Sequence, residues 1–396
     1  MTFFEQLVLA PPDPVFGIPK LVAADPRKEK LDLSVGSYQS ASGTPFVLHS
    51  VRKAERVLLH QHLPKTYQPI EGSQEFIQPI FPLIFGKDVT TQRKEQLLGM
   101  QTVGGTGALR VGGELLKKMG FSQIFLSQPS WANHRQIFEH AGLQVGSYPY
   151  FHPHSLQIDR DGFLEAIQQI PQKSAVLLQA CCHNPTGQDP TKEDWKELSH
   201  LFKKQQLLAV FDFAYQGFGE EMEEDAFSIR QFAEEGLEML VAYSFAKNMG
   251  LYGERVGALA LLCRETSSVP IVKSQANVLI RSTYSNPPLY GARIVSTILR
   301  STELFAEWRQ ELKNMRERIV EMRHALLASL QIYYPKKDFT SLAQQKGLFW
   351  WTGLHPQQVE HLREQVGIYL LLSSRMNLAG LTTETVDHVA KHLFSV

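Results

Sequence analysis

Short apolar runs that alternate with helical patterns constrain the fold of this chain more than any other feature of its sequence. The runs that stand out cover residues 124–126, 175–178, 207–211 and 240–242. Because polar residues do not alternate within them, these runs predict strands buried on both faces. Amphipathic segments at 107–119 and 192–205 predict helices between the strands. Strands that alternate with helices predict a parallel α/β sheet.

The length and the C-terminal part of the chain indicate a second structural unit. A chain of 396 residues exceeds the usual size of one hydrophobic core, which favours two domains. From about Thr302 a long charged segment places apolar residues at helical spacing, and residues 347–396 mix aromatic strand-like pieces with a closing helix. We therefore expect a smaller α+β domain at the C-terminus, joined by the N-terminal segment.

The charge balance and the cysteine content argue against several classes of partner. Lys plus Arg and Asp plus Glu both total 40, so no excess of positive charge is available to neutralise nucleic-acid phosphates or anionic lipids. The N-terminus lacks the basic region of a secretory signal, and no apolar run approaches the ~20 residues that cross a bilayer. The three cysteines include the adjacent pair Cys181 and Cys182, which suits a reducing compartment. We expect a soluble cytoplasmic protein without nucleic-acid or membrane partners.

A glycine-rich segment opens the first predicted helix. Residues 103–107 read VGGTG, and the missing side chains let backbone N–H groups approach an anion closely. The segment is neither a dinucleotide-binding fingerprint nor a Walker loop, because Arg110 stands where the fingerprint needs glycine and no Gly-Lys-Ser/Thr follows. It predicts a phosphate cradle, with a plain glycine turn as the alternative.

Two charged residues stand at the ends of apolar runs. Asp212 interrupts LLAVFDFAY, where a buried carboxylate needs a positive partner; the alternative is a strand-terminal aspartate that reaches water. Lys247 follows the run in LVAYSFAK, so its amine should emerge at the end of a buried strand. Desolvation there would lower the pKa of Lys247 and favour Schiff-base chemistry, although a lysine at a strand end is usually only solvated.

Several motifs, taken together and in order, resemble a known family. SWANH, CCHNPTG, FDFAYQGF, LYGERVGA and YSNPP occur in this order between residues 130 and 288. They are similar to motifs of the fold-type-I aminotransferases, specifically the aspartate and aromatic aminotransferase subgroup, and the resemblance extends from APPDPVFG to beyond Arg375. It implies a large cofactor-binding domain at 44–305 with a mostly parallel seven-stranded sheet, and a small C-terminal α+β domain at 306–396. Residues 1–43 would form an N-terminal arm and part of the small domain.

The resemblance implies pyridoxal phosphate as the cofactor, carried as a Schiff base on Lys247. Asp212 would pair with the protonated ring nitrogen and keep the ring an electron sink. Tyr215 and Asn184 would donate to the phenolic oxygen, and Trp131 would stack on the ring, unless it is a core tryptophan. The residues expected to hold the phosphate are Gly105, Thr106, Ser244, Arg255 and, from the neighbouring subunit, Tyr67. The histidines expected behind these groups are His134 and His183.

Substrate recognition is expected to depend on two arginines, because two carboxylates each suit a planar guanidinium. By resemblance, Arg375 would bind the α-carboxylate, while Arg281 would reach the distal carboxylate from the neighbouring subunit of a homodimer with shared sites. Trp131 and Asn184 would also face the substrate, and Gly36 matches the loop that closes over it. No metal is expected at Cys181, Cys182 and His183, because a structural zinc site needs about four spaced ligands.

The expected reaction is a reversible ping-pong transamination in which aspartate and 2-oxoglutarate give oxaloacetate and glutamate. Lys247 would alternate between holding the cofactor and carrying the α-proton. Ser37 and Gln39 depart from the residues usual in aspartate enzymes, so an aromatic or broad-specificity aminotransferase is the first alternative. Ala246 replaces a common serine and would remove one phosphate contact. A lyase or decarboxylase on the same scaffold, or a noncatalytic cofactor-binding protein, are further alternatives.

Overall fold

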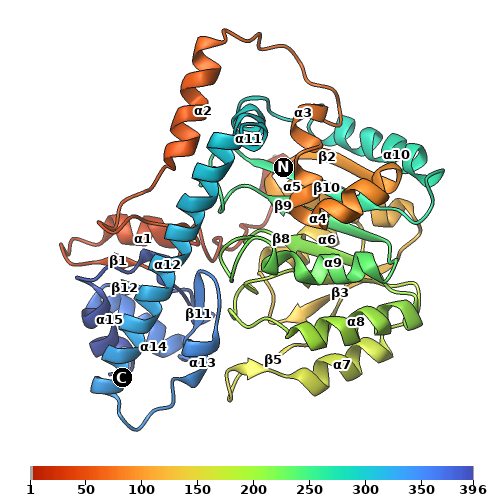
Figure 1. Ribbon diagram of the computed structural model, residues 1–396. Coiled ribbons are helices and arrows are strands. Elements are labelled where there is room, and N and C mark those ends of the chain that lie inside the picture. Colours follow the sequence, from red (N-terminus) through yellow and green to blue (C-terminus); the bar gives the residue numbers. More distant parts are fainter. Residues whose placement is uncertain (1–2, 396) are drawn as a thin grey trace.

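The computed structural model, which describes residues 3–395, is built around a seven-stranded sheet (Figure 1). The strands cross the sheet in the order β2 (Leu97–Val103), β10 (Val256–Leu262), β9 (Met239–Ser244), β8 (Leu208–Phe213), β7 (Ala175–Gln179), β3 (Gln123–Gln128) and β4 (Gln144–Pro149). Neighbouring strands are parallel except in the two pairs that include β10. The expected mostly parallel α/β sheet is confirmed, and the four predicted strands correspond to β3, β7, β8 and β9.

Alternate residues of the central strands face two separate hydrophobic cores. In β9, Met239 and Val241 belong to one buried cluster, whereas Leu240 and Ala242 belong to the other. The run reads as continuously apolar because both faces of the strand exclude water. Each fully buried Met, Val or Leu side chain stabilises the fold by roughly 1.5–3 kcal/mol. The carboxyl edge of the sheet is thereby a rigid base for the loops that follow each strand.

Helices pack on both faces of this sheet. One face carries α5 (Gly104–Lys118), α6 (Asn133–His140) and α10 (Ser268–Thr283), and the other carries α7 (Arg160–Gln169), α8 (Lys192–Gln205) and α9 (Phe227–Glu234). The helix predicted at 192–205 is confirmed, and a capping box between Thr191 and Asp194 fixes its start. Helix α5 begins at Gly104, earlier than the predicted 107, because packing at the end of β2 overrides the low helix propensity of its glycines.

The C-terminal part of the chain forms a second cluster of elements around the long helix α12 (Thr302–Tyr333), as expected from the pattern that starts near Thr302. Figure 1 shows α12 running from the side of the large sheet to two small sheets. In one, β1 (Leu31–Asp32) pairs in parallel with β12 (Ile368–Tyr369); in the other, β11 (Phe349–Trp351) pairs with β13 (Arg375–Asn377). The closing helix α15 (Val386–Leu393) packs on α12. The N-terminal segment thus joins the C-terminal unit through β1, while the domain boundaries stay a prediction.

The remaining elements connect or cover these two units. They are η1 (Phe3–Gln6), α1 (Ile18–Ala24), α2 (His49–His60), α3 (Gln74–Ile77), α4 (Ile80–Gln92), η2 (Lys94–Gln96), β5 (Phe151–His152), β6 (Gln157–Ile158), η3 (Glu224–Ala226), α11 (Tyr290–Arg300), α13 (Thr340–Gln344), α14 (Pro356–His361), η4 (Leu362–Val366) and η5 (Leu378–Gly380). Between residues 3 and 395, no helix is both long enough and apolar enough to cross a membrane.

Several of the predicted site residues lie at the carboxyl edge of the parallel strands. Asp212 is the penultimate residue of β8, Ser244 is the last residue of β9, and α5 begins directly after β2. In open α/β sheets this edge is where ligands bind. The sheet therefore brings together residues that lie far apart in the sequence.

Candidate active site

Asp212 is oriented by a buried histidine. His134, in the first turn of α6, places Nε2 2.9 Å from Oδ2 of Asp212, and its Nδ1 lies 2.8 Å from the hydroxyl of Ser130. The Asp212 side chain keeps 11% of its surface exposed, and its Oδ1 has no hydrogen-bond partner within residues 3–395. Trp131 meets the His134 ring edge-on, with 5.1 Å between ring centres. The carboxylate is thus fixed on one side and free to receive a positive group on the other.

Lys247 lies just beyond β9, between two tyrosine rings. Its Nζ is 5.8 Å from the ring centre of Tyr215 and 5.7 Å from that of Tyr252. Desolvation lowers the pKa of Lys247 to about 8; the positive charges of Arg255 and Arg375 act in the same direction, and Asp212 opposes them. The expected effect of desolvation is confirmed. At pH 7 about a tenth of the amine is neutral and nucleophilic, far more than in an ordinary lysine.

The N-terminus of α5, Ser244 and Arg255 form a cradle for an anion. A Cβ added to Gly104, whose φ is +68°, would lie 2.7 Å from Nη2 of Arg255, and one added to Gly105 would lie 3.2 Å from Cβ of Ser244. Thr106 stands in the same first turn. Backbone N–H groups at a helix start, a hydroxyl and a guanidinium are the donors that hold a phosphate. The close approach requires glycine at 104.

Arg375, the first residue of β13, is buried beside this cluster. Its Nη1 donates to Oδ1 of Asn184 at 3.0 Å and its Nη2 donates to the carbonyl of Ser34 at 2.7 Å. The guanidinium lies 4.2 Å from the ring centre of Phe349, and its Nε is buried without a partner among the described residues. Burial lowers the pKa of Arg375 to about 10, so it stays charged at neutral pH. A buried cation with one unused donor suits a ligand carboxylate.

Comparison with known proteins identifies the family behind this arrangement. Residues 28–393 match the family model for aminotransferase class I and II. The chain belongs to this aminotransferase family. It is 40% identical to the mitochondrial aspartate aminotransferase of Gallus gallus, over 100% of this chain and 94% of the relative. It is 42% identical to the cytoplasmic aspartate aminotransferase of Oryza sativa subsp. japonica, over 98% and 96% of the two chains.

A solved structure has the same fold over nearly the whole of this aminotransferase. The aromatic-amino-acid aminotransferase from Burkholderia pseudomallei, covalently bound to pyridoxal phosphate, superposes with a TM-score of 0.96 at 38% identity, over 99% of each chain. The predicted family and fold are therefore confirmed. Aspartate and aromatic aminotransferases both occur among its relatives, as the sequence motifs suggested.

Phe349 and Tyr252 belong to the site of the aminotransferase but were not expected from the sequence. The Phe349 ring lies 5.8 Å from that of Tyr215, and a Cβ on Gly36 would lie 2.7 Å from its Cζ. Glycine at 36 therefore leaves room for the ring that covers Arg375. The only sequence signal for Tyr252 is its place in the motif LYGERVGA. Phe349 is recognisable only as part of a strand-like aromatic run.

Three of the predicted residues lie outside the cluster in the single chain. His183 bonds Ser127 at 2.9 Å and Thr186 at 2.8 Å, so it supports the loop that carries Asn184 and does not contact Asp212. Tyr67 is 91% exposed. Arg281 is also exposed and bonds the hydroxyl of Ser285 in its own segment. No contact joins Tyr67 or Arg281 to Lys247 within residues 3–395.

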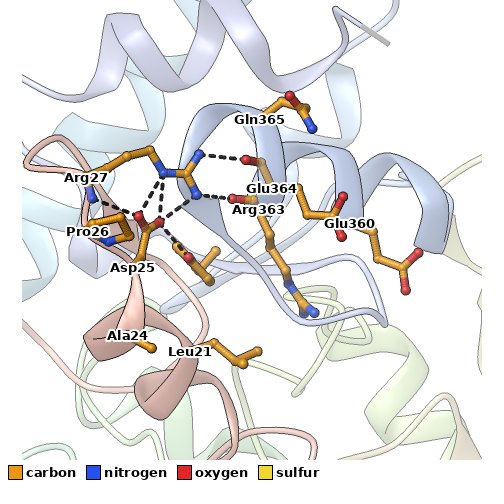
Figure 2. A pocket seen from close by; sticks show the side chains of 10 residues that line it. Leu21, Ala24, Asp25, Pro26, Arg27, Glu360, Arg363, Glu364 and Gln365 are labelled. Atoms are coloured by element: carbon orange, nitrogen blue, oxygen red, sulfur yellow. Dashed lines mark hydrogen bonds and ion pairs between the residues drawn. The ribbon is translucent and has the colours of Figure 1, made fainter.

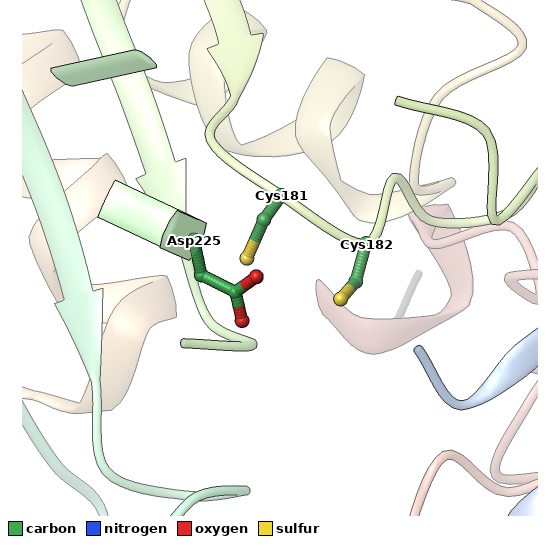
Figure 3. Close-up of side chains that lie close together, drawn as sticks. All are labelled: Cys181, Cys182 and Asp225. Carbon is green, nitrogen blue, oxygen red and sulfur yellow. The ribbon is translucent and has the colours of Figure 1, made fainter. Parts of the chain in front are cut away.

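Cys181 and Cys182, which follow β7, lie close to Asp225 (Figure 3). Their sulfur and oxygen atoms lie within 4.8 Å of one another. Burial raises the pKa of both thiols, that of Cys182 to about 11, which keeps them in the protonated form that binds metals poorly. The Asp225 carboxylate already accepts three backbone N–H groups, those of Gly217, Gly219 and Glu220. The cluster fits a structural role, and the absence of a metal here stays a prediction.

Proposed function

We propose that this aminotransferase moves the amino group of L-aspartate to 2-oxoglutarate, giving oxaloacetate and L-glutamate, with pyridoxal phosphate as its cofactor. The observation that carries this proposal is the buried guanidinium of Arg375, which has a free donor and lies close enough to Lys247 to lower its pKa. A carboxylate bound there would present its α-carbon toward the amine. The aspartate aminotransferases at 40% and 42% identity support the choice of substrate.

The donor set of the site fits pyridoxal phosphate at each of its functional groups. The missing Cβ atoms of Gly104 and Gly105 let the backbone approach Arg255 and Ser244 closely. The positive charge of Arg255 and the backbone N–H groups of the helix start suit a phosphate. The free Oδ1 of Asp212 suits a ring N–H, and Lys247 offers an amine to the aldehyde. We assign to the cofactor, on these grounds, Gly105, Thr106, Trp131, Asn184, Asp212, Tyr215, Ser244, Lys247 and Arg255.

The chemistry then divides among a few side chains. When bound, the cofactor supplies an electron sink for negative charge at the substrate α-carbon. Lys247, with its pKa lowered to about 8, would take the α-proton and deliver it to the former aldehyde carbon of the cofactor, as general base and then general acid. His134 holds Asp212 so that the carboxylate keeps a proton on the ring nitrogen. Burial raises the pKa of Tyr215, so its hydroxyl stays a donor.

The distal carboxylate of the substrate requires a second chain. Arg281 and Tyr67 are exposed and do not reach Lys247 in their own chain. We therefore propose a homodimer in which Arg281 and Tyr67 of one subunit complete the active site of the other subunit. Apolar residues near the N-terminus, among them Phe3, Phe4 and Leu9, are exposed and offer surface to a partner. The three cysteines are free, which supports the cytoplasm as the proposed compartment.

An aromatic or broad-specificity aminotransferase is the second candidate. Ser37 and Gln39 stand in the loop that Asn377 holds through the carbonyls of Val35 and Ser37, next to the Arg375 strand. The aromatic aminotransferase with a TM-score of 0.96 supports this reading. Comparable kcat/KM for tyrosine and aspartate would favour it, and Arg281→Ala should then impair only the dicarboxylic substrates.

Following the visible absorption of the purified protein tests the proposed function. Aspartate should bleach the cofactor band, 2-oxoglutarate should restore it, and oxaloacetate and glutamate should form in equal amounts. Ammonia or carbon dioxide released without oxo-acid exchange would identify a lyase or decarboxylase instead. A protein that binds the cofactor but leaves every amino acid unchanged would be a noncatalytic binding protein.

A further inference from the structure

A side-chain clamp formed by Asp25, Arg27 and Tyr369 fastens the N-terminal segment to the C-terminal part of the chain (Figure 2). Arg27 donates through Nε to Oδ1 of Asp25 at 2.9 Å and through Nη2 to Oδ2 at 2.6 Å. The hydroxyl of Tyr369 donates to the same Oδ2 at 2.7 Å. The Asp25 side chain is only 4% exposed, whereas the Arg27 side chain keeps 34% of its surface exposed, so the clamp is half-buried.

The guanidinium of Arg27 also reaches across to η4. Its Nη1 donates to the carbonyl of Glu364 at 2.8 Å, and its Nη2 donates to that of Arg363 at 2.6 Å. The rigid fork of a guanidinium, with five N–H donors, serves a carboxylate and two carbonyls at once. A cavity of about 840 Å³ opens beside the clamp, between α1 and η4, and none of the predicted site residues lines it. The clamp therefore shares no residue with the predicted site.

The clamp is connected to the active site through Tyr369. The hydroxyl of Tyr369 holds Asp25, while its carbonyl accepts the backbone N–H of Leu33 at 2.9 Å. The next residue is Ser34, whose carbonyl accepts from Nη2 of Arg375. The strand pairing between these segments is short, because β1 and β12 have two residues each. So short a ladder needs side-chain support to keep its register.

We propose that Asp25 and Arg27 are positioning residues that set the affinity of the enzyme for the substrate α-carboxylate. This inference rests on the proposed function, because it acts through Arg375. When the clamp is broken, the segment that leads to Ser34 loosens and its carbonyl leaves Nη2 of Arg375. The guanidinium then loses one of its two supports, the other being Asn184. Substrate binding weakens, while the proton transfer at Lys247 is unaffected.

The test uses the cofactor-loaded protein and the variants Arg27→Ala, Asp25→Asn and Arg27→Lys. We expect KM for aspartate to rise about tenfold in Arg27→Ala with kcat within about twofold of wild type, because a binding contact is lost and no reacting group is changed. Arg27→Lys keeps the charge but not the fork, so it should not restore KM. Backbone hydrogen exchange without substrate should speed up in residues 31–38 and stay unchanged in the large sheet.

Arg160→Ala is the matched control, because Arg160 binds Asp194 at 2.5 Å with a partly exposed side chain but lies on α7. It should leave both KM and the exchange of residues 31–38 unchanged. An unchanged KM in Arg27→Ala, or a fall in kcat with faster exchange throughout the molecule, would overturn the positioning role. A wild-type protein without any aminotransferase activity would overturn the proposed function first and this inference with it.

Discussion

At the scale of single residues, reactivity here follows from surroundings more than from residue type. Lys247 is one of many lysines, yet desolvation at the end of β9 lowers its pKa to about 8. Asp212 keeps one oxygen free because His134 occupies the other. Arg375 keeps one unpaired donor because Asn184 and Ser34 occupy only its Nη atoms. Each group retains an unused capacity that a ligand can satisfy.

Lys247→Ala should abolish turnover while leaving noncovalent cofactor binding in place. The substitution removes the base that carries the α-proton, so we expect kcat to fall by more than about a thousandfold. The phosphate cradle and Asp212 remain, so cofactor should still copurify. Borohydride reduction followed by mass spectrometry should label the wild type and not the variant. Lys118→Ala, an exposed lysine on α5, is the control; turnover retained in Lys247→Ala would refute the assignment.

Capture of pyridoxal phosphate by cofactor-free protein should depend on pH through Lys247. Only the neutral amine attacks the aldehyde, and a lowered pKa means that the neutral form dominates above about 8. The capture rate should therefore rise with pH through a midpoint near 8 and level off above it. Stopped-flow absorbance across this range measures the midpoint. A midpoint near 10.5, the ordinary lysine value, would show that desolvation does not act on this amine.

At the scale of elements, helix starts and very short strands do most of the positioning. The first turn of α5 brings backbone donors to Arg255 and Ser244, which requires glycine at 104. The two-residue strands β1 and β12 carry the segment that leads to Ser34. Neither element has a strong local signal, because glycines weaken helix propensity and two residues show no periodicity.

Gly104→Ala should weaken anion binding as well as the fold. A side chain at φ +68° costs roughly 1 kcal/mol in any context, and here its Cβ would also press on Arg255. Gly236→Ala is the matched control: its φ is +75° and nothing lies within 4 Å of the added Cβ. We expect denaturant unfolding to show a lower free energy of unfolding in both variants. Cofactor titration should show a weaker affinity for the cofactor only in Gly104→Ala. Equal affinities would contradict the crowding of Arg255.

At the scale of the whole molecule, the candidate site draws on almost the full length of the chain. Its residues extend from Ser34, next to β1, to Arg375 on β13, and α12 links the two units that carry them. Buried Arg323 on α12 donates to the carbonyls of Leu342 and Gly347, just before Phe349. The position of Phe349 over Arg375 therefore depends on contacts within the C-terminal unit.

Neither Lys247→Ala nor Arg281→Ala should be active toward aspartate by itself. Co-expressing the two variants should restore this activity. In a mixed dimer with shared sites, one site combines the native Lys247 of one chain with the native Arg281 of the other. One of the two sites is then native and the other lacks both residues, so the purified mixed dimer should have about half of the wild-type activity. Purification through two different tags isolates the mixed dimer, and its steady-state rate is the readout. No recovery in a verified mixed dimer would mean that each site is formed by one chain.

The sequence by itself determined the family, the mostly parallel sheet and the identity of the residues proposed to carry the chemistry. Buried strands produce continuous apolar runs, and contiguous motifs such as FDFAYQGF keep their residues together in any fold that contains them. Only the tertiary structure decided which side chains meet. His134 and Asp212 are 78 residues apart, Ser34 and Arg375 are 341 apart, and the contacts of Phe349 had no sequence signal. Local periodicity encodes the face of a strand or helix, whereas contacts between distant residues depend on strand order and on the path of the loops.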